Sequence, residues 1–137
     1  MPTEKITIKT AVSANAQKVW DYYTKPEHIT NWNFASEDWC CPTASNDLKV
    51  GGRYLARMEA KDGSFGFDFD ATYTEINQGK SFSYEFGGRF ATVEFNEQQD
   101  QTEVRISFDP ETDNSLDLQR QGWQAILDNF KKYTETN

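Results

Sequence analysis

The sequence predicts an α+β domain in which a curved antiparallel sheet wraps around a long C-terminal helix. Three observations support this fold class. An alternating segment near the N-terminus precedes two short helical segments, alternating aromatic segments separated by turns fill the middle of the chain, and an amphipathic segment of about 20 residues ends it. A sheet with one apolar face needs a cover, and only the last segment is long enough to supply it. We expect residues 1–137 to form one such domain.

The first elements come before the main run of strands. Residues 5–12 alternate between polar and mainly apolar side chains, which predicts a half-buried strand. Asn15 can cap a short helix that ends before Pro26, and Pro26 can begin a second short helix that runs to Trp32. Residues 33–48 are rich in Ser, Asp, Asn, Cys and Pro and show no period, so we expect a long loop there.

A meander of antiparallel strands follows. Asp62-Gly63 is a strong two-residue hairpin signal, and Gln78-Gly79 and Gly87-Gly88 indicate two further turns. Between these turns aromatic residues occupy every second position, which predicts strands with one apolar face. The expected strands lie at residues 53–60, 65–74, 82–86, 91–95 and 104–108.

The turns also predict how the strands pair. A two-residue turn at the first hairpin places Met58 opposite Phe67 and leaves Asp68 and Asp70 on the opposite, solvated face, where Asp68 meets Arg57. We therefore interpret the two carboxylates as surface ion-pair partners and not as an acid and base of catalysis. The same count across the second turn places Tyr73 opposite Tyr84 and Ala71 opposite Phe86.

The last element is a helix with one apolar stripe. Asp113 or Asn114 can cap it, and Trp123 lies in the middle of the stripe. Gly122 beside it lacks a side chain, so we expect a close backbone approach there that anchors the helix on the sheet through Trp123. Together with the strands this is a helix-grip architecture. The stripe consists of Leu116, Trp123, Ile126, Leu127, Phe130 and Tyr133.

Composition limits the classes of partner. The chain has 14 Lys and Arg against 22 Asp and Glu, a formal charge of −8 at pH 7. An acidic chain without a basic stripe is repelled by phosphate backbones and anionic lipids, so we expect neither nucleic acid nor a membrane as partner. The charged N-terminus and the lack of a long apolar run favour a cytoplasmic protein. Adjacent Cys40 and Cys41 are poorly placed to bridge each other, which agrees with a reducing compartment.

Short motifs spread along nearly the whole chain are together typical of one family. In chain order they are Val19-Trp20, Pro26-Glu27-His28 with Trp32, Val50-Gly51-Gly52, Tyr73-Thr74-Glu75-Ile76 before Gly79-Lys80, and Gly122-Trp123 with Ile126-Leu127 and Phe130. In this order the chain resembles the Hsp90-ATPase-activator-homologue (AHSA1-like) branch of the START/Bet v 1-like superfamily, often called SRPBCC. The resemblance implies the helix-grip fold and a ligand class, namely lipids, sterols, polyketides or other hydrophobic molecules, but no reaction. Eukaryotic Hsp90 activators of this branch carry an additional N-terminal domain for which 137 residues leave no room, so Hsp90 is the less favoured partner.

Large side chains on the side of the strands that faces inward can fill an ordinary core or line a cavity. A sheet that grips one helix does not close at both ends, and rings packed around one helix tend to leave a void. The leading hypothesis is therefore a binding protein for a small hydrophobic molecule such as a lipid, an aromatic or a polyketide-like compound. Its candidate ligand-binding residues are Trp32, Trp39, Met58, Phe67, Phe69, Tyr84, Phe86 and Trp123.

Two other functions stay open from the sequence. One is an enzyme of cyclase, hydrolase or dehydratase type that uses polar groups such as Tyr84, Arg89 or Trp39 in the same cavity, and the other is an interaction module, including a chaperone cofactor. No catalytic residue, metal site or cofactor is predicted. The single histidine, His28, is expected on an exposed helix surface, and the adjacent cysteine pair lacks the spacing of a redox or metal motif.

Overall fold

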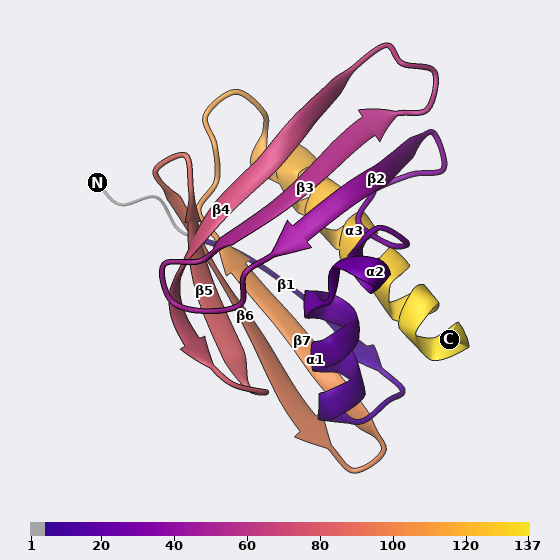
Figure 1. Cartoon of the computed structure of the whole chain (residues 1–137), viewed down its shortest axis with the longest axis vertical. Helices are drawn as coiled ribbons and strands as arrows, with labels where there is room; N and C mark the ends of the chain where they lie inside the picture. Colours follow the sequence, from indigo (N-terminus) through magenta and orange to yellow (C-terminus); the bar gives the residue numbers. More distant parts are fainter. Residues whose placement is uncertain (1–4) are drawn as a thin grey trace.

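Seven antiparallel strands form one curved sheet in the computed structural model, which describes residues 5–137 (Figure 1). The strand order is β1-β7-β6-β5-β4-β3-β2, so that the first strand pairs with the last and the remaining strands form a meander. The strands are β1 (Ile6–Val12), β2 (Trp39–Asn46), β3 (Arg53–Ala60), β4 (Gly66–Asn77), β5 (Ser81–Phe86), β6 (Arg89–Gln98) and β7 (Gln101–Phe108). The helices are α1 (Ala16–Thr24), α2 (Pro26–Ile29) and α3 (Leu116–Thr136). This is the helix-grip fold that the sequence predicts.

Helix α3 lies along β1, the edge strand of the sheet (Figure 1). Side chains of α3 donate hydrogen bonds to every second backbone carbonyl of β1, because alternate carbonyls of an edge strand point away from the sheet. The helix therefore covers an edge that would otherwise offer unpaired acceptors. The donor atoms and carbonyls are Arg120 Nη1 to Thr7 (3.2 Å), Gln124 Nε2 to Lys9 (3.3 Å) and Lys131 Nζ to Ala11 (2.8 Å).

The prediction of a long loop over residues 33–48 is wrong for its second half, where β2 pairs with β3. The ladder is interrupted between Cys40 and Thr43, and Pro42 lies in this interruption, where its missing N–H costs no ladder hydrogen bond. The interruption breaks the alternation along this polar edge strand. Pairing with β3, and not a sequence pattern, makes this segment a strand.

Two helix ends also differ from the prediction. Asn15 caps α1 as expected, its Oδ1 accepting from Lys18 N at 2.9 Å. Helix α2, however, ends at Ile29, and the chain to Trp32 forms turns. Helix α3 is capped by Ser115, whose Oγ accepts from Leu118 N at 3.1 Å, and not by the two residues before it.

The register of the first hairpin is confirmed, with Met58 opposite Phe67 and Arg57 opposite Asp68. The turn is longer than predicted, since Ala60 N donates to Phe65 O, but the register is unchanged. Asp68 and Asp70 lie exposed on the outer face, where the first pairs with Arg57 at 3.5 Å and the second with Arg53. Exposed pairs of this kind contribute about 0 to 1 kcal/mol.

The second hairpin reaches its predicted register by a different route. Tyr73 faces Tyr84 as predicted, but Asn77 pairs with Ser81, so the turn contains one residue more than expected. A bulge between Tyr73 and Glu75 then shifts the register back by one residue. The predicted pair Ala71–Phe86 is not part of the ladder, which ends at Thr72–Glu85.

Candidate functional site

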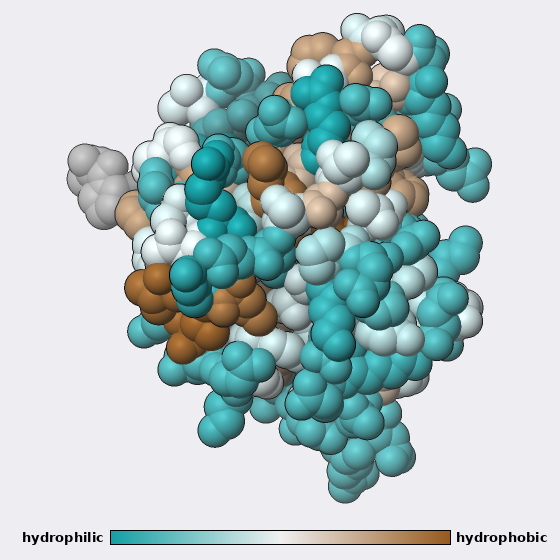
Figure 2. Space-filling model, in the orientation of Figure 1, coloured by the Kyte–Doolittle hydropathy of each residue, from teal (hydrophilic) through white to brown (hydrophobic). Residues whose placement is uncertain are grey.

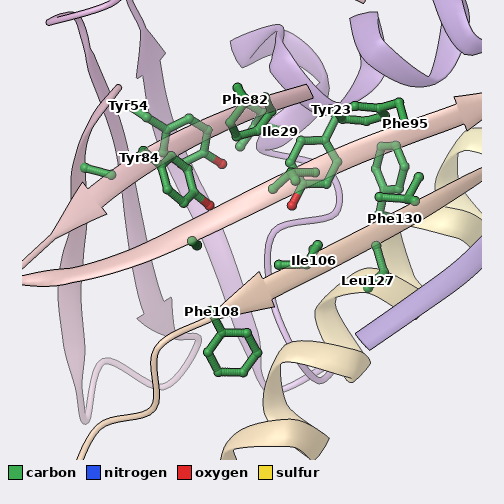
Figure 3. Close-up of a cluster of buried hydrophobic side chains, with 14 of the residues drawn as sticks. Tyr23, Ile29, Tyr54, Phe82, Tyr84, Phe95, Ile106, Phe108, Leu127 and Phe130 are labelled. Atoms are coloured by element: carbon green, nitrogen blue, oxygen red, sulfur yellow. The ribbon is translucent and has the colours of Figure 1, made fainter. Parts of the chain in front are cut away.

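The sheet carries most of its buried rings on the face turned toward the helices, and the part beneath α1 is closely packed. Trp20 and Tyr23 of α1 meet Phe82 of β5 and Phe95 of β6, with ring centroids between 5.2 and 6.1 Å apart. Figure 3 shows the rings of Tyr23, Phe82 and Phe95. Phe130 of α3 closes the cluster, 5.0 Å from Tyr23. Helical spacing along α1 turns both of its rings inward, so that the helix fills this half of the space above the sheet.

The space between β3, β4, β5 and the N-terminal half of α3 is not filled. It holds a cavity of about 340 Å³. The mouth of the cavity is formed by lining residues that are exposed: Phe67 on β4, Leu118 on α3 and Asn114 in the loop before that helix. The deeper lining is buried and mainly apolar: Tyr23, Trp32, Tyr54, Met58, Tyr84, Phe86, Ile106 and Leu127.

The sequence-based candidates divide clearly between the cavity wall and the outside. Trp39 is not part of the wall, because it begins β2 opposite Ala60 at the far end of β3 and packs its ring on Phe65 and Phe67, with centroids 5.9 and 6.1 Å away. The other candidates all line the cavity: Trp32, Met58, Phe67, Phe69, Tyr84, Phe86 and Trp123.

Gly122 faces the cavity and does not serve the close backbone approach that the sequence suggested. A Cβ atom placed on it would meet no atom within 4 Å. Trp123 does contact the sheet, lying flat on Phe108 of β7 with ring centroids 3.9 Å apart. The missing side chain at position 122 therefore leaves room in the cavity, while the neighbouring ring holds the helix on the sheet.

Sequence reasoning missed part of the wall. Leu118, Gly122 and Ile126 follow one another at i, i+4 and i+8 on α3 and form the helix side of the cavity. Of the three, only Ile126 belongs to the apolar stripe that the sequence predicts, and none is among the predicted ligand-binding residues, although their spacing is visible in the sequence. Tyr23 was missed because only the fold brings α1 to the cavity, whereas Tyr54 shares the inward side of β3 with Met58 and was within reach of the same alternation argument.

Polar groups near the mouth come from β6 and the loop before α3. The guanidinium of Arg89 lies 4.8 Å from the centroid of the Phe86 ring, and its Nε donates to the Asp109 carbonyl at 3.1 Å. The buried Gln119 side chain ties the loop to the helix: its Oε1 accepts from Glu111 N, and its Nε2 donates to the Asn114 carbonyl, both at 2.8 Å. These contacts hold one side of the mouth in place.

Three tyrosine hydroxyls, those of Tyr23, Tyr54 and Tyr84, line the inner end of the cavity, which we call its floor. Tyr54 Oη accepts from Asn33 Nδ2 at 3.3 Å, whereas the hydroxyls of Tyr23 and Tyr84 make no hydrogen bond in the part of the chain that the structure describes and are open to the cavity, since neither oxygen is fully enclosed. Burial raises the pKa of each of these three groups well above that of a free tyrosine, and the neighbouring tyrosines raise it further. All three are therefore protonated at neutral pH and can donate hydrogen bonds.

His28 and the cysteines lie away from the cavity wall. His28 is half-buried and not exposed as expected, because its ring stacks on Tyr22 at 3.9 Å and its Nδ1 lies 2.8 Å from Tyr133 Oη. Cys40 and Cys41 are both free, and burial raises the pKa of the Cys41 thiol to about 11. A thiol with a raised pKa is a poor nucleophile at neutral pH.

Two further properties of residues 5–137 concern metals and membranes. No group of three or more His, Cys, Asp and Glu side chains there is arranged to hold a metal ion. None of the described helices is long and apolar enough to cross a membrane. Hydrophilic and neutral side chains cover most of the face shown in Figure 2.

The curved sheet and the long helix that packs against it, with the cavity between them, define a helix-grip domain. The chain belongs to the family described as activator of Hsp90 ATPase homolog 1-like proteins, whose model matches residues 13–135. A comparison with curated proteins found no match.

Solved structures of bacterial proteins agree with this assignment. An AHSA1-like protein from Aeromonas hydrophila is 41% identical, with a TM-score of 0.91 over 96% of this chain and 92% of that one. A protein from Cytophaga hutchinsonii is 46% identical, with a TM-score of 0.83 over 97% of this chain and 93% of that one. A protein from Chromobacterium violaceum, with 20% identity and a TM-score of 0.84 over 98% of this chain and 99% of that one, shares the fold.

Proposed function

We propose that this protein binds a small hydrophobic molecule in the cavity between the sheet and the N-terminal half of α3. The observation that carries the proposal is the cavity itself: about 340 Å³, open at one end and lined mainly by aromatic and aliphatic side chains. Small-molecule sites are typically preformed apolar cavities of roughly 300 to 1,000 Å³ with a few polar groups. The volume lies near the lower end of that range and suits a compact ligand better than a long-chain lipid.

Energetics supports the same proposal. A void lined by Phe69, Phe86 and Trp123 forgoes the dispersion contacts that a filled core would make. An apolar ligand restores these contacts and removes its own surface from water, which contributes about 25 cal/mol per Å². Exposed Phe67 and Leu118 at the mouth give such a ligand apolar contacts as it enters.

Two measurements test the proposal. Native mass spectrometry of protein purified from its own host identifies any ligand that stays bound, and NMR titration with a varied hydrophobic panel maps the binding site. We expect saturable binding with shifts centred on Met58, Phe69 and Tyr84. No saturable binding by any panel member, or shifts confined to exposed polar residues, contradicts the proposal.

A matched pair of variants separates cavity binding from surface binding. Gly122→Leu places a side chain in the cavity, where the backbone leaves space for it, and should lower affinity at least tenfold. Gln121→Leu adds the same side chain at an exposed position of the same helix that does not line the cavity, and should leave affinity unchanged. Equal affinities for the two variants would place the ligand elsewhere.

The same mass spectra address the enzyme alternative. Of the polar groups that such an enzyme would use, Tyr84 and Arg89 line the cavity and Trp39 does not. A bound compound that changes mass during incubation with the protein would favour catalysis. A compound that is retained unchanged favours binding alone.

A further inference from the structure

The floor of the cavity offers hydrogen-bond donors that this chain leaves without acceptors. Tyr84 and Tyr23 are 4% and 7% exposed, and neither hydroxyl makes a hydrogen bond within residues 5–137, yet neither oxygen is fully enclosed, so both open onto the cavity. Tyr54 is also 4% exposed, and because its oxygen accepts from Asn33, its own proton is free to be donated. Polar groups in the interior of folded proteins are nearly always hydrogen-bonded, so the acceptor for these hydroxyls comes from the cavity, as water or as part of a ligand.

The three hydroxyls face the same part of the cavity. The rings of Tyr54 and Tyr84 lie 5.9 Å apart, and Figure 3 shows their oxygens turned toward the side of the cavity on which Tyr23 lies. A single ligand atom at this place can therefore accept from more than one of them.

The chemistry of the floor selects the kind of atom. Protonated tyrosines donate, so the complementary group is an acceptor. A buried carboxylate needs a cation, and Arg89, the only cation among the described residues of the cavity wall, lies over Phe86 at the end of the β5–β6 hairpin. A buried ammonium needs a carboxylate, and the one carboxylate of the described wall, Glu111, belongs to the loop before α3. An uncharged oxygen acceptor needs no partner of opposite charge, so it avoids the cost of burying an unpaired charge.

We infer that the ligand carries an uncharged oxygen acceptor of the carbonyl class at its buried end, and that Tyr84 and Tyr23 donate hydrogen bonds to it. The inference rests on the proposed function, since it specifies the chemistry of the molecule in that cavity. An aromatic or alicyclic ketone meets both requirements, because its rings match the apolar wall and its oxygen matches the floor.

Isosteric pairs of probes test the inference. Benzophenone and 1,1-diphenylethylene differ only in C=O against C=CH₂, as do 2-acetylnaphthalene and 2-isopropenylnaphthalene. One hydrogen bond contributes about 0.5 to 1.5 kcal/mol, so we expect the wild-type protein to bind the ketone of at least one pair about 3- to 10-fold more tightly. The carbonyl ¹³C resonance of labelled ketone should move downfield on binding, as a hydrogen-bonded carbonyl does.

Tyrosine variants locate the donor. Tyr84→Phe and Tyr23→Phe remove one hydroxyl each and should lower the ketone preference and the ¹³C shift while leaving affinity for the hydrocarbon within about twofold. Tyr73→Phe is the matched control, because Tyr73 does not line the cavity and its hydroxyl donates to Asn46 Oδ1 at 2.8 Å. It should leave the preference unchanged.

The outcomes separate this inference from the proposed function. If ketone and hydrocarbon bind equally, or if neither tyrosine variant changes the ketone preference, water satisfies the floor hydroxyls and the inference is wrong while cavity binding stands. If no member of either pair and no compound of the wider panel binds, the proposed function is overturned, and the inference with it.

Discussion

The two halves of the core are built from the same kinds of side chain but differ in how they are filled. Beneath α1, rings from α1, β5, β6 and α3 meet within 5.0 to 6.1 Å and enclose fully buried Val19 and Trp20. Beneath the first half of α3, rings of β4 and β5 face a cavity of about 340 Å³.

The difference comes from the helices and not from the sheet. Strand β5 supplies Phe82 to the filled half and Tyr84 and Phe86 to the hollow half, all on one face and all buried. Above the filled half lies α1, whereas above the hollow half α3 lies along the edge strand β1 and turns Gly122 toward the sheet. Aromatic composition therefore does not decide whether a core is solid. The number of helices above the sheet and the size of their inward residues decide it.

The largest expected difference between the halves is the cost of removing a tryptophan. Trp20→Ala should lower the free energy of unfolding by about 3 to 5 kcal/mol, because the ring is fully buried among other rings. Trp123→Ala should cost about 1 to 3 kcal/mol, because one side of this half-buried ring already faces the cavity. Urea unfolding at constant slope measures both, and an equal cost would contradict the division of the core.

Alkaline pH should destabilise the protein through its buried tyrosines. Folding raises the pKa of Tyr23, Tyr54, Tyr73 and Tyr84, mainly through burial, so above pH 10 the unfolded state releases protons that the folded state retains. The stability is fully present below pH 10 and falls above it by about 1.4 kcal/mol per pH unit for each such group. Unfolding midpoints between pH 8 and 11 measure the loss, and Tyr84→Phe should reduce its slope. A flat profile up to pH 11 would contradict tyrosine burial.

Added volume should have opposite effects in the two halves. Val19→Phe forces a larger side chain into a fully buried site and should cost about 1 to 3 kcal/mol. Gly122→Ala should stabilise the protein by about 0.5 to 1 kcal/mol, since alanine favours the helix and meets no atom within 4 Å. Thermal unfolding of the two variants checks this pair, and a destabilising alanine at position 122 would mean that the cavity closes in solution.

The smallest expected difference concerns two hydroxyls. Tyr73→Phe removes a hydrogen bond to Asn46 and should cost about 1 kcal/mol. Tyr84→Phe removes a hydroxyl without a partner in the described chain and should change the stability of the ligand-free protein by less than about 0.5 kcal/mol. A cost for Tyr84→Phe equal to that for Tyr73→Phe would show that water or protein satisfies Tyr84 without ligand.

Periodicity and turn chemistry predicted most of the fold because both are local properties. The register between Met58 and Phe67 follows from one turn. Strand β2 escaped prediction because its polar sequence shows no alternation, the ladder being interrupted between Cys40 and Thr43, and only its pairing with β3 identifies it as a strand. The register of Tyr73 was predicted correctly although the turn and the bulge behind it were not, since the two one-residue shifts cancel.

The cavity wall was predictable on the sheet side and less so elsewhere. Alternation identifies which side of a strand is buried, so Phe69, Tyr84 and Phe86 were named from sequence, and they do line the cavity. Trp39 was named as a large ring with a polar N–H, but it lies outside the wall, because at the tip of the edge strand β2 it packs on Phe65 and Phe67. The floor contributed by α1 depends on a tertiary contact that no local pattern encodes.

The pairing of β1 with β7 has a consequence for how the chain folds. It brings Ile6 beside Phe108, and these two residues stand at opposite ends of the part of the sequence that forms the sheet. Each hairpin of the meander, in contrast, joins two strands that follow each other in the sequence. Contacts between distant residues slow folding, because the intervening chain must be ordered before they form. During synthesis β1 leaves the ribosome before the other strands yet has no partner until β7 follows it, and α3, which covers its other edge, follows β7. The first strand of the sheet to be made is thus the last to be paired, and the cavity gains its roof only after every strand has been made.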